Sequence, residues 1–359
     1  MSKRVAFWAF GGENDASAQY RARMVCNALI EQGSTDEFLF DARGPIIGWN
    51  HKWSGDQPPP TARIEWVQNP EHDIVVISRP ARRWWADVIP YLRDYGIRVV
   101  VDMDDLFDRI HPKNAAHQAY DPNRDMTVNH EWADEACKRA DLVTCTTPAL
   151  QKRYGHGHSV VLPNLVPERY LWMDSFPRPA TMGWTGSVHT HPEDLQATKG
   201  AVPVVLEANG WDFGVVGDGD GVKDALGLRQ EPAITGRVPF AMYVDLMAKF
   251  SVGIVPLADT EFNRAKSCLK MIEFAALGVP VAATATPDNE RMFNQGVGRI
   301  VNHPSHWRKT LNRLVTNRDF REELAGHSRE AMKRHTYEAQ CERWAFAWGL
   351  ERSRVPVGT

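Results

Sequence analysis

Short apolar runs alternate with amphipathic stretches along almost the whole chain. Runs such as residues 4–10, 97–102 and 252–255 have the length of buried strands. Stretches such as residues 17–31 and 239–250 repeat their apolar positions at helical spacing. Strands that alternate with helices in this way predict an α/β protein with parallel sheets.

The length of the chain and its prolines predict two domains. A chain of 359 residues is longer than one core normally serves. Pro167, Pro177 and Pro179 lie within a single irregular stretch. We therefore place an N-terminal domain at residues 1–175 and start the second domain at residue 176.

The composition is that of a globular protein in a reducing compartment. Hydrophobic residues make up 43% and charged residues 24%, and the formal net charge of −3 gives no basic field that would favour nucleic acid or anionic membrane. No apolar run approaches the roughly 20 residues that a membrane span needs. The five cysteines are scattered, which predicts free thiols. We expect a cytoplasmic protein without integral membrane association.

A helix followed by a buried strand is predicted near residue 270. Asn263 suits the N-cap of a helix over residues 265–277, Gly278 ends it, and residues 279–283 form the strand. The face that would pack on a sheet consists of Ala265, Leu269, Ile272 and Ala276.

Charged residues form a second stripe on this predicted helix. Lys266, Lys270 and Glu273 follow one another at i, i+4 and i+7. Unpaired backbone N–H groups and two lysines near a helix start, with a carboxylate two turns in, suit a diphosphate followed by a ribose. Gly186 and Ser187 lie between a predicted strand and a predicted helix, where a glycine lets the backbone approach a phosphate.

This stretch resembles the donor-binding helix of retaining GT-B glycosyltransferases, of the glycosyl transferases group 1 family. In that family a lysine and small residues hold the diphosphate of a nucleotide sugar, and a glutamate before a Gly-x-Pro turn binds the ribose. The matching positions are Lys266, Ser267, Cys268, Leu269, Glu273, Gly278 and Pro280. One position departs from the pattern, because many members carry a first glutamate where this chain has Ala265.

The resemblance implies a fold and an organisation. The fold class would be α/β, with two Rossmann-like GT-B domains facing across a cleft. Residues 176–335 would bind the nucleotide sugar, and a C-terminal helix within residues 336–359 would pack back on the N-terminal domain. The run from Gly183 to Ser187 is similar to the family's first C-terminal strand and glycine loop, and Gly236 to Pro239 is similar to the loop that grips the base.

The resemblance also implies an activity: transfer of a sugar from a nucleoside diphosphate to an acceptor hydroxyl, with retention and without a metal or other cofactor. The acceptor, whether glycan, lipid, protein or modified nucleic acid, is left open. The expected catalytic residues are Lys266, Arg237, His189 and Asp104. The expected donor-binding residues are Gly186, Ser187, Val238, Ser267, Cys268, Leu269 and Glu273. On the acceptor side we expect Gly12, Gln19, Tyr20, Arg21 and Asp102.

Several residues allow more than one interpretation. Asp102 and Asp104 follow an apolar run and point the same way if extended, as in the metal signature of the GT-A fold, so a metal-dependent GT-A-like transferase is an alternative. Arg21 either neutralises phosphate or pairs with Glu13 or Asp15.

A third hypothesis comes from another class of protein. A Rossmann-like protein that binds a nucleotide without turnover would explain the absence of the first glutamate at Ala265. The histidines at 156 and 158 have no cysteine or carboxylate cluster at zinc spacing, and we expect them in a surface turn.

Overall fold

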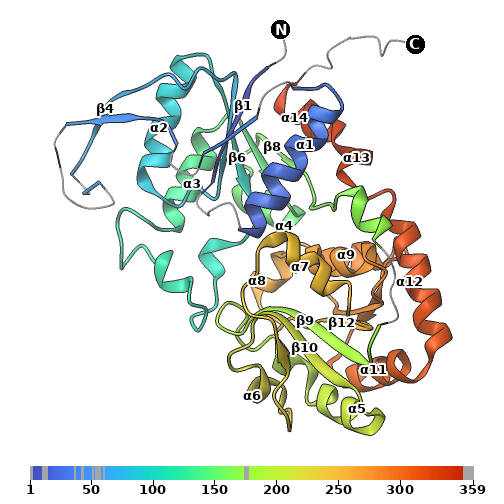
Figure 1. The fold of residues 1–359 in the computed structure, drawn as a ribbon. Coiled ribbons are helices and arrows are strands. Elements are labelled where there is room, and N and C mark those ends of the chain that lie inside the picture. Colours follow the sequence, from blue (N-terminus) through green and yellow to red (C-terminus); the bar gives the residue numbers. More distant parts are fainter. Residues whose placement is uncertain are drawn as a thin grey trace, which may run out of the picture. The chain divides into compact units, whose positions relative to one another are not determined.

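The chain forms two compact units (Figure 1). The computed structural model describes residues 3–9, 15–35, 38–41, 44–50, 52, 58–59, 61–173 and 178–350. The first unit comprises Met1–Ile110, Ala116–Asn164 and Gln340–Thr359, and the second comprises His111–Ala115 and Leu165–Ala339. The chain thus changes unit after Asn164. Residues 175 and 176, where we placed the boundary, lie outside the described residues.

The first unit is built on a six-stranded parallel sheet in the order β2-β1-β5-β6-β7-β8. Its strands are β1 (Val5–Ala9), β2 (Phe38–Asp41), β5 (Ile74–Ser78), β6 (Arg98–Met103), β7 (Leu142–Cys145) and β8 (Ser159–Val161). β1 and β5 are buried along their whole length, as expected for central parallel strands covered on both faces. A separate antiparallel hairpin joins β3 (Ile47–Trp49) to β4 (Ile64–Val67).

Helices connect these strands, and two of them begin at residues whose side chains cap the helix. The helices are η1 (Ala18–Arg23), α1 (Met24–Glu31), α2 (Arg83–Asp94), η2 (Phe107–Arg109), η3 (His117–Ala119), α3 (His130–Arg139), α4 (Pro148–Tyr154) and α14 (Glu342–Trp348). The Asn129 side chain accepts from the first turn of α3, and Thr147 caps α4 with Pro148 at its first position. The helix expected after the first strand is present, although η1 is a π-helical segment.

The second unit has a six-stranded parallel sheet in the order β11-β10-β9-β12-β13-β14. Its strands are β9 (Thr181–Ser187), β10 (Asp212–Asp218), β11 (Ala233–Ile234), β12 (Val252–Val255), β13 (Val281–Thr284) and β14 (Arg299–Val301). Numbered within the unit, this is the strand order 3-2-1-4-5-6 of a doubly wound Rossmann sheet. The predicted α/β class with parallel sheets is confirmed in both units.

Helices and aromatic side chains cover the second sheet. The helices are η4 (Glu168–Trp172), η5 (Leu195–Thr198), α5 (Ala201–Asn209), α6 (Val222–Leu226), α7 (Phe240–Met247), α8 (Glu261–Ala265), α9 (Leu269–Ala276), α10 (Pro287–Phe293), η6 (Pro304–His306), α11 (Trp307–Thr316), α12 (Arg318–Met332) and α13 (Tyr337–Gln340). Gly183 and Gly214 pair across β9 and β10, and a Cβ on either would collide with the Phe250 ring. These strand glycines therefore let an aromatic ring lie directly on the sheet.

The prediction of a single helix over residues 265–277 is wrong. The structure has two helices, α8 and α9, separated by three residues that begin with an extended Lys266. Thr260, and not Asn263, caps α8, because the Asn263 amide instead donates to Asp194 and to the carbonyl of Ala258. The last predicted helix is likewise divided into α13 and α14. The second of these belongs to the first unit, where it contacts α1.

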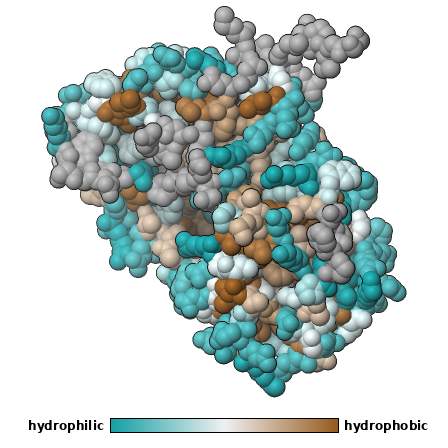
Figure 2. Space-filling view, in the orientation of Figure 1, coloured by the Kyte–Doolittle hydropathy of each residue, from teal (hydrophilic) through white to brown (hydrophobic). Residues whose placement is uncertain are grey.

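No described helix is both long and apolar enough to cross a membrane. Figure 2 shows that most of the visible surface is hydrophilic.

Candidate functional site

The second sheet has a topological switch point between β9 and β12, its two central strands. After β9 the chain continues to the strands on one side of this pair, and after β12 it continues to the strands on the other side. This divergence opens a crevice at the carboxyl ends of the two strands, where ligands of doubly wound folds bind. The carboxyl end of β9 carries Gly186 and Ser187, and the segment after β12 leads into α8 and α9. The topology therefore brings the predicted glycine tip and the predicted lysine helix to one place.

The tip of β9 has a backbone that only glycine adopts comfortably. Gly186 has φ of 149° and Gly217, beside it on β10, has φ of 130°. A Cβ on Gly217 would collide with the carbonyl oxygen of Gly186. The Ser187 carbonyl then accepts from the amides of Thr190 and His191, which folds a tight turn over the strand end. This is a backbone that a phosphate can approach closely.

The break between α8 and α9 is fixed by a residue from α10. The buried Asp288 accepts the Cys268 amide at 2.8 Å and is itself paired with Arg291 at 2.6 Å. Cys268 is therefore the N-cap of α9, and burial raises the pKa of its thiol. Lys266 lies half-buried in the break, with Nζ 4.5 Å from the centre of the Phe262 ring. Ser267 and Leu269 are also half-buried there.

One turn further along α9, Lys270 and Glu273 meet a tyrosine from α7. The Lys270 ammonium donates to the Tyr243 hydroxyl at 2.7 Å, and this hydroxyl lies 3.3 Å from both Glu273 Oε2 and Thr185 Oγ1. Glu273 is 1% exposed. Burial and the charge of Glu273 raise the pKa of Tyr243 to about 12, so the phenol stays neutral. Burial disfavours the charged Lys270, but Tyr243 and Glu273 outweigh it and raise the pKa of this lysine.

A half-buried histidine and a buried carboxylate lie beside the lysines. His191 Nδ1 lies 3.0 Å from Asp194 Oδ2, and the other Asp194 oxygen accepts from the Asn263 amide and from the Ala258 backbone. Burial lowers the pKa of His191, and the positive charges of Lys266 and Lys270 lower it further. The ring is therefore neutral at pH 7 and is oriented by Asp194.

Other residues expected at the donor site lie at its margin. His189 and Arg237 are exposed, and Val238 is half-buried. His189 Nε2 lies 3.4 Å from the Asp220 carboxylate. Ala265, at the position of the missing glutamate, is a buried residue at the end of α8.

In the first unit, Arg21 and Asp102 form a buried ion pair. Arg21 donates to both Asp102 oxygens, at 2.7 and 3.0 Å, and also to the carbonyl of Leu162. Thr144 donates to the same carboxylate. Only 1% of Arg21 and 2% of Asp102 are exposed. Among the described residues Arg21 thus pairs with Asp102 and not with Asp15, while Glu13, the other expected partner, lies outside the described residues. The pair leaves almost no surface for an acceptor.

Asp104 lies in a second charged cluster of the same unit. The Ser17 hydroxyl donates to it, and Arg79 lies 3.9 Å from it while pairing with Asp15 at 2.8 Å. Burial raises the pKa of Asp104 to about 6; Arg79 opposes this rise and the nearby Asp105 adds to it. Of the other acceptor-side residues, Gln19 is half-buried and Tyr20 is buried, and Gly12 lies outside the described residues.

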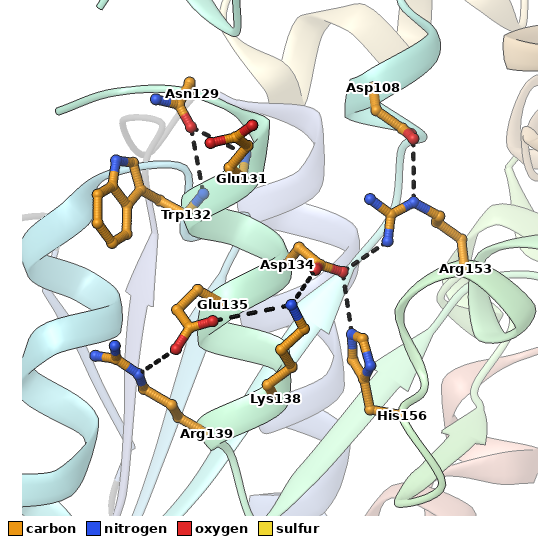
Figure 3. A network of polar contacts seen from close by, with 10 residues as sticks. All are labelled: Asp108, Asn129, Glu131, Trp132, Asp134, Glu135, Lys138, Arg139, Arg153 and His156. Atoms are coloured by element: carbon orange, nitrogen blue, oxygen red, sulfur yellow. Dashed lines mark hydrogen bonds and ion pairs between the residues drawn. The ribbon is translucent and has the colours of Figure 1, made fainter. Parts of the chain in front are cut away.

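His156 and His158 connect a turn to α3 through hydrogen bonds. Figure 3 shows the contact of His156. His156 Nε2 lies 3.0 Å from Asp134, which also binds Arg153 and Lys138. His158 Nε2 lies 2.9 Å from the carbonyl oxygen of Cys137. In the part of the chain that the structure describes, no three His, Cys, Asp or Glu residues are grouped to hold a metal ion.

Comparison with known proteins agrees with this architecture. Residues 179–317 match the family described as Glycosyl transferases group 1. Sucrose-phosphate synthase from Thermosynechococcus elongatus superposes with a TM-score of 0.62 at 12% identity, over 97% of this chain and 98% of that chain. HepE of Anabaena, solved with UDP and glucose, gives a TM-score of 0.60 at 13% identity, over 97% and 99%. The fold is GT-B.

Two further findings define the extent of this GT-B likeness. TarM gives a TM-score of 0.52 at 15% identity over 77% of this chain, which spans only about half (54%) of the TarM chain. No curated protein sequence matches this chain. The identification as a group 1 type is thus confirmed over residues 179–317, within the second unit, and the likeness to solved structures confirms the fold.

Sequence reasoning missed several residues of the GT-B switch point. Tyr243, Asp288 and the pair His191 and Asp194 come from three different segments that only the sheet order brings together. A local signal existed for two of them, because His191 and Asp194 are three residues apart after a glycine tip. Tyr243 and Asp288 have no such signal.

Proposed function

We propose that the protein is a glycosyltransferase that moves a sugar from a nucleoside-diphosphate sugar to an acceptor hydroxyl. The observation that carries this proposal is the convergence of a glycine tip, Lys266 and the Lys270–Tyr243–Glu273 cluster at the switch point of the second sheet. Cationic groups and a polar carboxylate there suit a diphosphate and a ribose. The group 1 match over residues 179–317 supports the same activity.

The chemistry requires stabilisation of the charge that develops on the leaving diphosphate. Lys266, the amides at the start of α9 and the backbone at Gly186 and Ser187 supply positive charge and donors. Arg237, exposed after the Gly236 turn, and His189, exposed after the tip of β9, reach the donor from the rim. Glu273, held by Tyr243, accepts hydrogen bonds from the ribose hydroxyls.

We propose retention at the anomeric carbon. The bond from this carbon to the diphosphate oxygen breaks while the acceptor oxygen bonds on the same face, and the acceptor proton passes to the departing diphosphate. The neutral His191 is a positioning residue beside Lys266. Gln19 and Asp104 of the first unit remain our candidates for the acceptor side, whereas Tyr20, only 1% exposed, leaves as little surface for an acceptor as Arg21 does.

We propose a reaction without metal. In the metal-dependent alternative, Asp102 and Asp104 hold the ion together, but Asp102 is occupied on both oxygens by Arg21 and Thr144. Opening that pair would leave a buried arginine without its counter-charge, which is costly. A cytoplasmic location is in keeping with the five cysteines, which are all free and buried.

The test is release of nucleoside diphosphate from UDP-, GDP-, ADP- and TDP-sugars, with and without EDTA. UDP-sugars come first, because the HepE structure contains UDP. Slow hydrolysis of one donor, unchanged by EDTA and lost in Lys266→Gln, is the expected result. Loss of activity with EDTA would instead favour the metal-dependent alternative, in which Asp102 and Asp104 hold the ion. Donor binding without turnover in the presence of varied acceptors would favour a nucleotide-binding protein.

A further inference from the structure

A second polar cavity lies at the opposite end of the second sheet from the switch point. It has a volume of ≈ 700 Å³ and is formed where β12 and β13 begin, at the turn after α9 and along α12. The lining residues are Arg178, Ser251, Gly278, Pro280, Arg318, Arg321, Glu322, Ala325, Gly326 and Arg329. Figure 1 shows α12 along the side of this unit, and Figure 2 shows that side as hydrophilic.

The lining of this cavity, here called the arginine pocket, carries an excess of positive charge. Among the described residues its lining contains four arginines and one carboxylate, Glu322, which pairs with Arg318 at 2.7 Å on the exposed side of α12. Arg178 donates only to the carbonyls of Ala248, Leu277 and Gly278 among the described residues. The local charge thus contrasts with the chain as a whole, whose formal net charge is −3.

The other two guanidinium groups also bind carbonyl oxygens. Arg329 donates to Leu277, and Arg321 donates to Leu314 and Val315 at the end of α11. These bonds satisfy helix ends, but a carbonyl dipole does not neutralise a full charge. Nε of Arg329 is buried and has no hydrogen-bond partner within the described chain.

The charges in the arginine pocket destabilise one another. Burial, and then the nearby charge of Arg329, lower the pKa of Arg178 to about 10. Burial also lowers the pKa of Arg329, and burial together with the charge of Arg318 lowers that of Arg321. A bound anion would relieve this repulsion.

We propose that the arginine pocket binds a phosphate dianion, either inorganic phosphate or the phosphate group of a small phosphorylated sugar. Guanidinium groups match the geometry of phosphate oxygens with paired N–H donors, and a doubly charged anion suits an uncompensated cluster of arginines better than a single carboxylate does. The volume falls in the range of small-ligand sites. This site is separate from the proposed donor site, because it lies at the amino ends of the strands.

Gly326 offers a variant that changes the charge of the pocket without touching its arginines. It lies inside α12, and a Cβ there would meet no atom within 4 Å. Gly326→Glu places a carboxylate in the pocket, and Gly326→Gln is the matched neutral control of the same shape. Both should fold at least as well as the parent, because glycine is a poor helix former.

The experiment is calorimetric titration of the full chain with inorganic phosphate, glucose 6-phosphate, glucose and sulfate. We expect binding of phosphate, glucose 6-phosphate or both, at least tenfold weaker in Gly326→Glu than in Gly326→Gln. Tighter binding of glucose 6-phosphate than of phosphate would identify a sugar phosphate as the ligand, and the reverse order would identify free phosphate. Equal binding in the two Gly326 variants, or no binding, would overturn the proposal.

Two controls separate this site from the donor site and from ion binding at large. Lys266→Gln should leave the titration unchanged, whereas loss of binding in this variant would place the anion at the switch point and contradict the proposal. Sulfate that binds as tightly as both phosphates would mean an adventitious ion only, which also overturns it. Failure of the donor-hydrolysis assay would leave these outcomes unaffected.

Discussion

The two units use the carboxyl ends of their parallel strands differently. In the first unit the charged side chains there largely bind one another: Arg21 and Asp102 are almost fully buried and satisfied by protein groups. In the second unit Lys266 lies half-buried at the switch point, beside a backbone tip that takes a positive φ. Similar residue types therefore stabilise the fold in one unit and are placed for a ligand in the other.

The partners that a charged group already has, more than its residue type, separate the two roles. Arginine and aspartate near strand ends suggest a site in any Rossmann-like sequence. A carboxylate whose two oxygens already accept three protein donors has little capacity left for a substrate. A substitution should therefore change stability in the first unit and activity in the second.

The largest expected effect is that of Arg21→Gln on stability. Removing one partner of a buried ion pair leaves the other charge uncompensated, so the free energy of unfolding should fall by about 3–5 kcal/mol. Urea unfolding measures this loss. The double variant Arg21→Met with Asp102→Leu is the control and should recover at least half of it. If the Arg21→Gln protein is fully stable but inactive, Arg21 serves activity and not stability, which contradicts the comparison.

Asp104→Asn should change how stability depends on pH. The folded-state pKa of Asp104 is about 6, above the ordinary value of 3.8. This carboxyl therefore contributes stability below about pH 4, and that contribution is lost as the pH rises through 6. The variant lacks this loss, so its stability relative to the parent should rise between pH 4 and 7, by up to about 3 kcal/mol. Parallel stability curves for the two proteins would contradict the raised pKa.

Lys266→Gln should lower the rate of donor turnover and leave stability almost unchanged. The lysine is half-buried at the switch point, and removing one group that stabilises developing negative charge typically costs at least about a hundredfold in rate. Lys249→Gln, at an exposed lysine of the same unit, is the matched control and should retain full activity. A change of more than about 1 kcal/mol in the unfolding free energy of Lys266→Gln would indicate a structural lysine instead.

Tyr243→Phe should have the smallest effect, and this effect should appear in both the unfolding free energy and the affinity for the donor. The variant removes a hydroxyl shared by Lys270, Glu273 and Thr185, which should cost about 1 kcal/mol of stability. It should also weaken donor binding several-fold, because Glu273 loses its positioning partner. Tyr95→Phe removes a hydroxyl bonded to a carbonyl in the first unit and should change stability alone.

Much of the second unit could be predicted from local pattern. Alternating apolar runs predicted the parallel α/β class. The stretch around Lys266 indicated a resemblance to group 1 glycosyltransferases, because its residue types are closely spaced. The first unit was harder to interpret. Arg21 and Asp102 are 81 residues apart, and no local pattern indicates that they pair.

The sequence alone is sufficient to predict the α/β class and the segments that form the candidate donor site. Both follow from short-range patterns: period, turn residues and one motif. Three features follow from the tertiary structure alone: the break between α8 and α9, the ion pair of Arg21 with Asp102, and the contact of Tyr243 with Glu273. These depend on strand order, which sets the neighbours of a buried polar group, and such a group must find its partner wherever the chain supplies one.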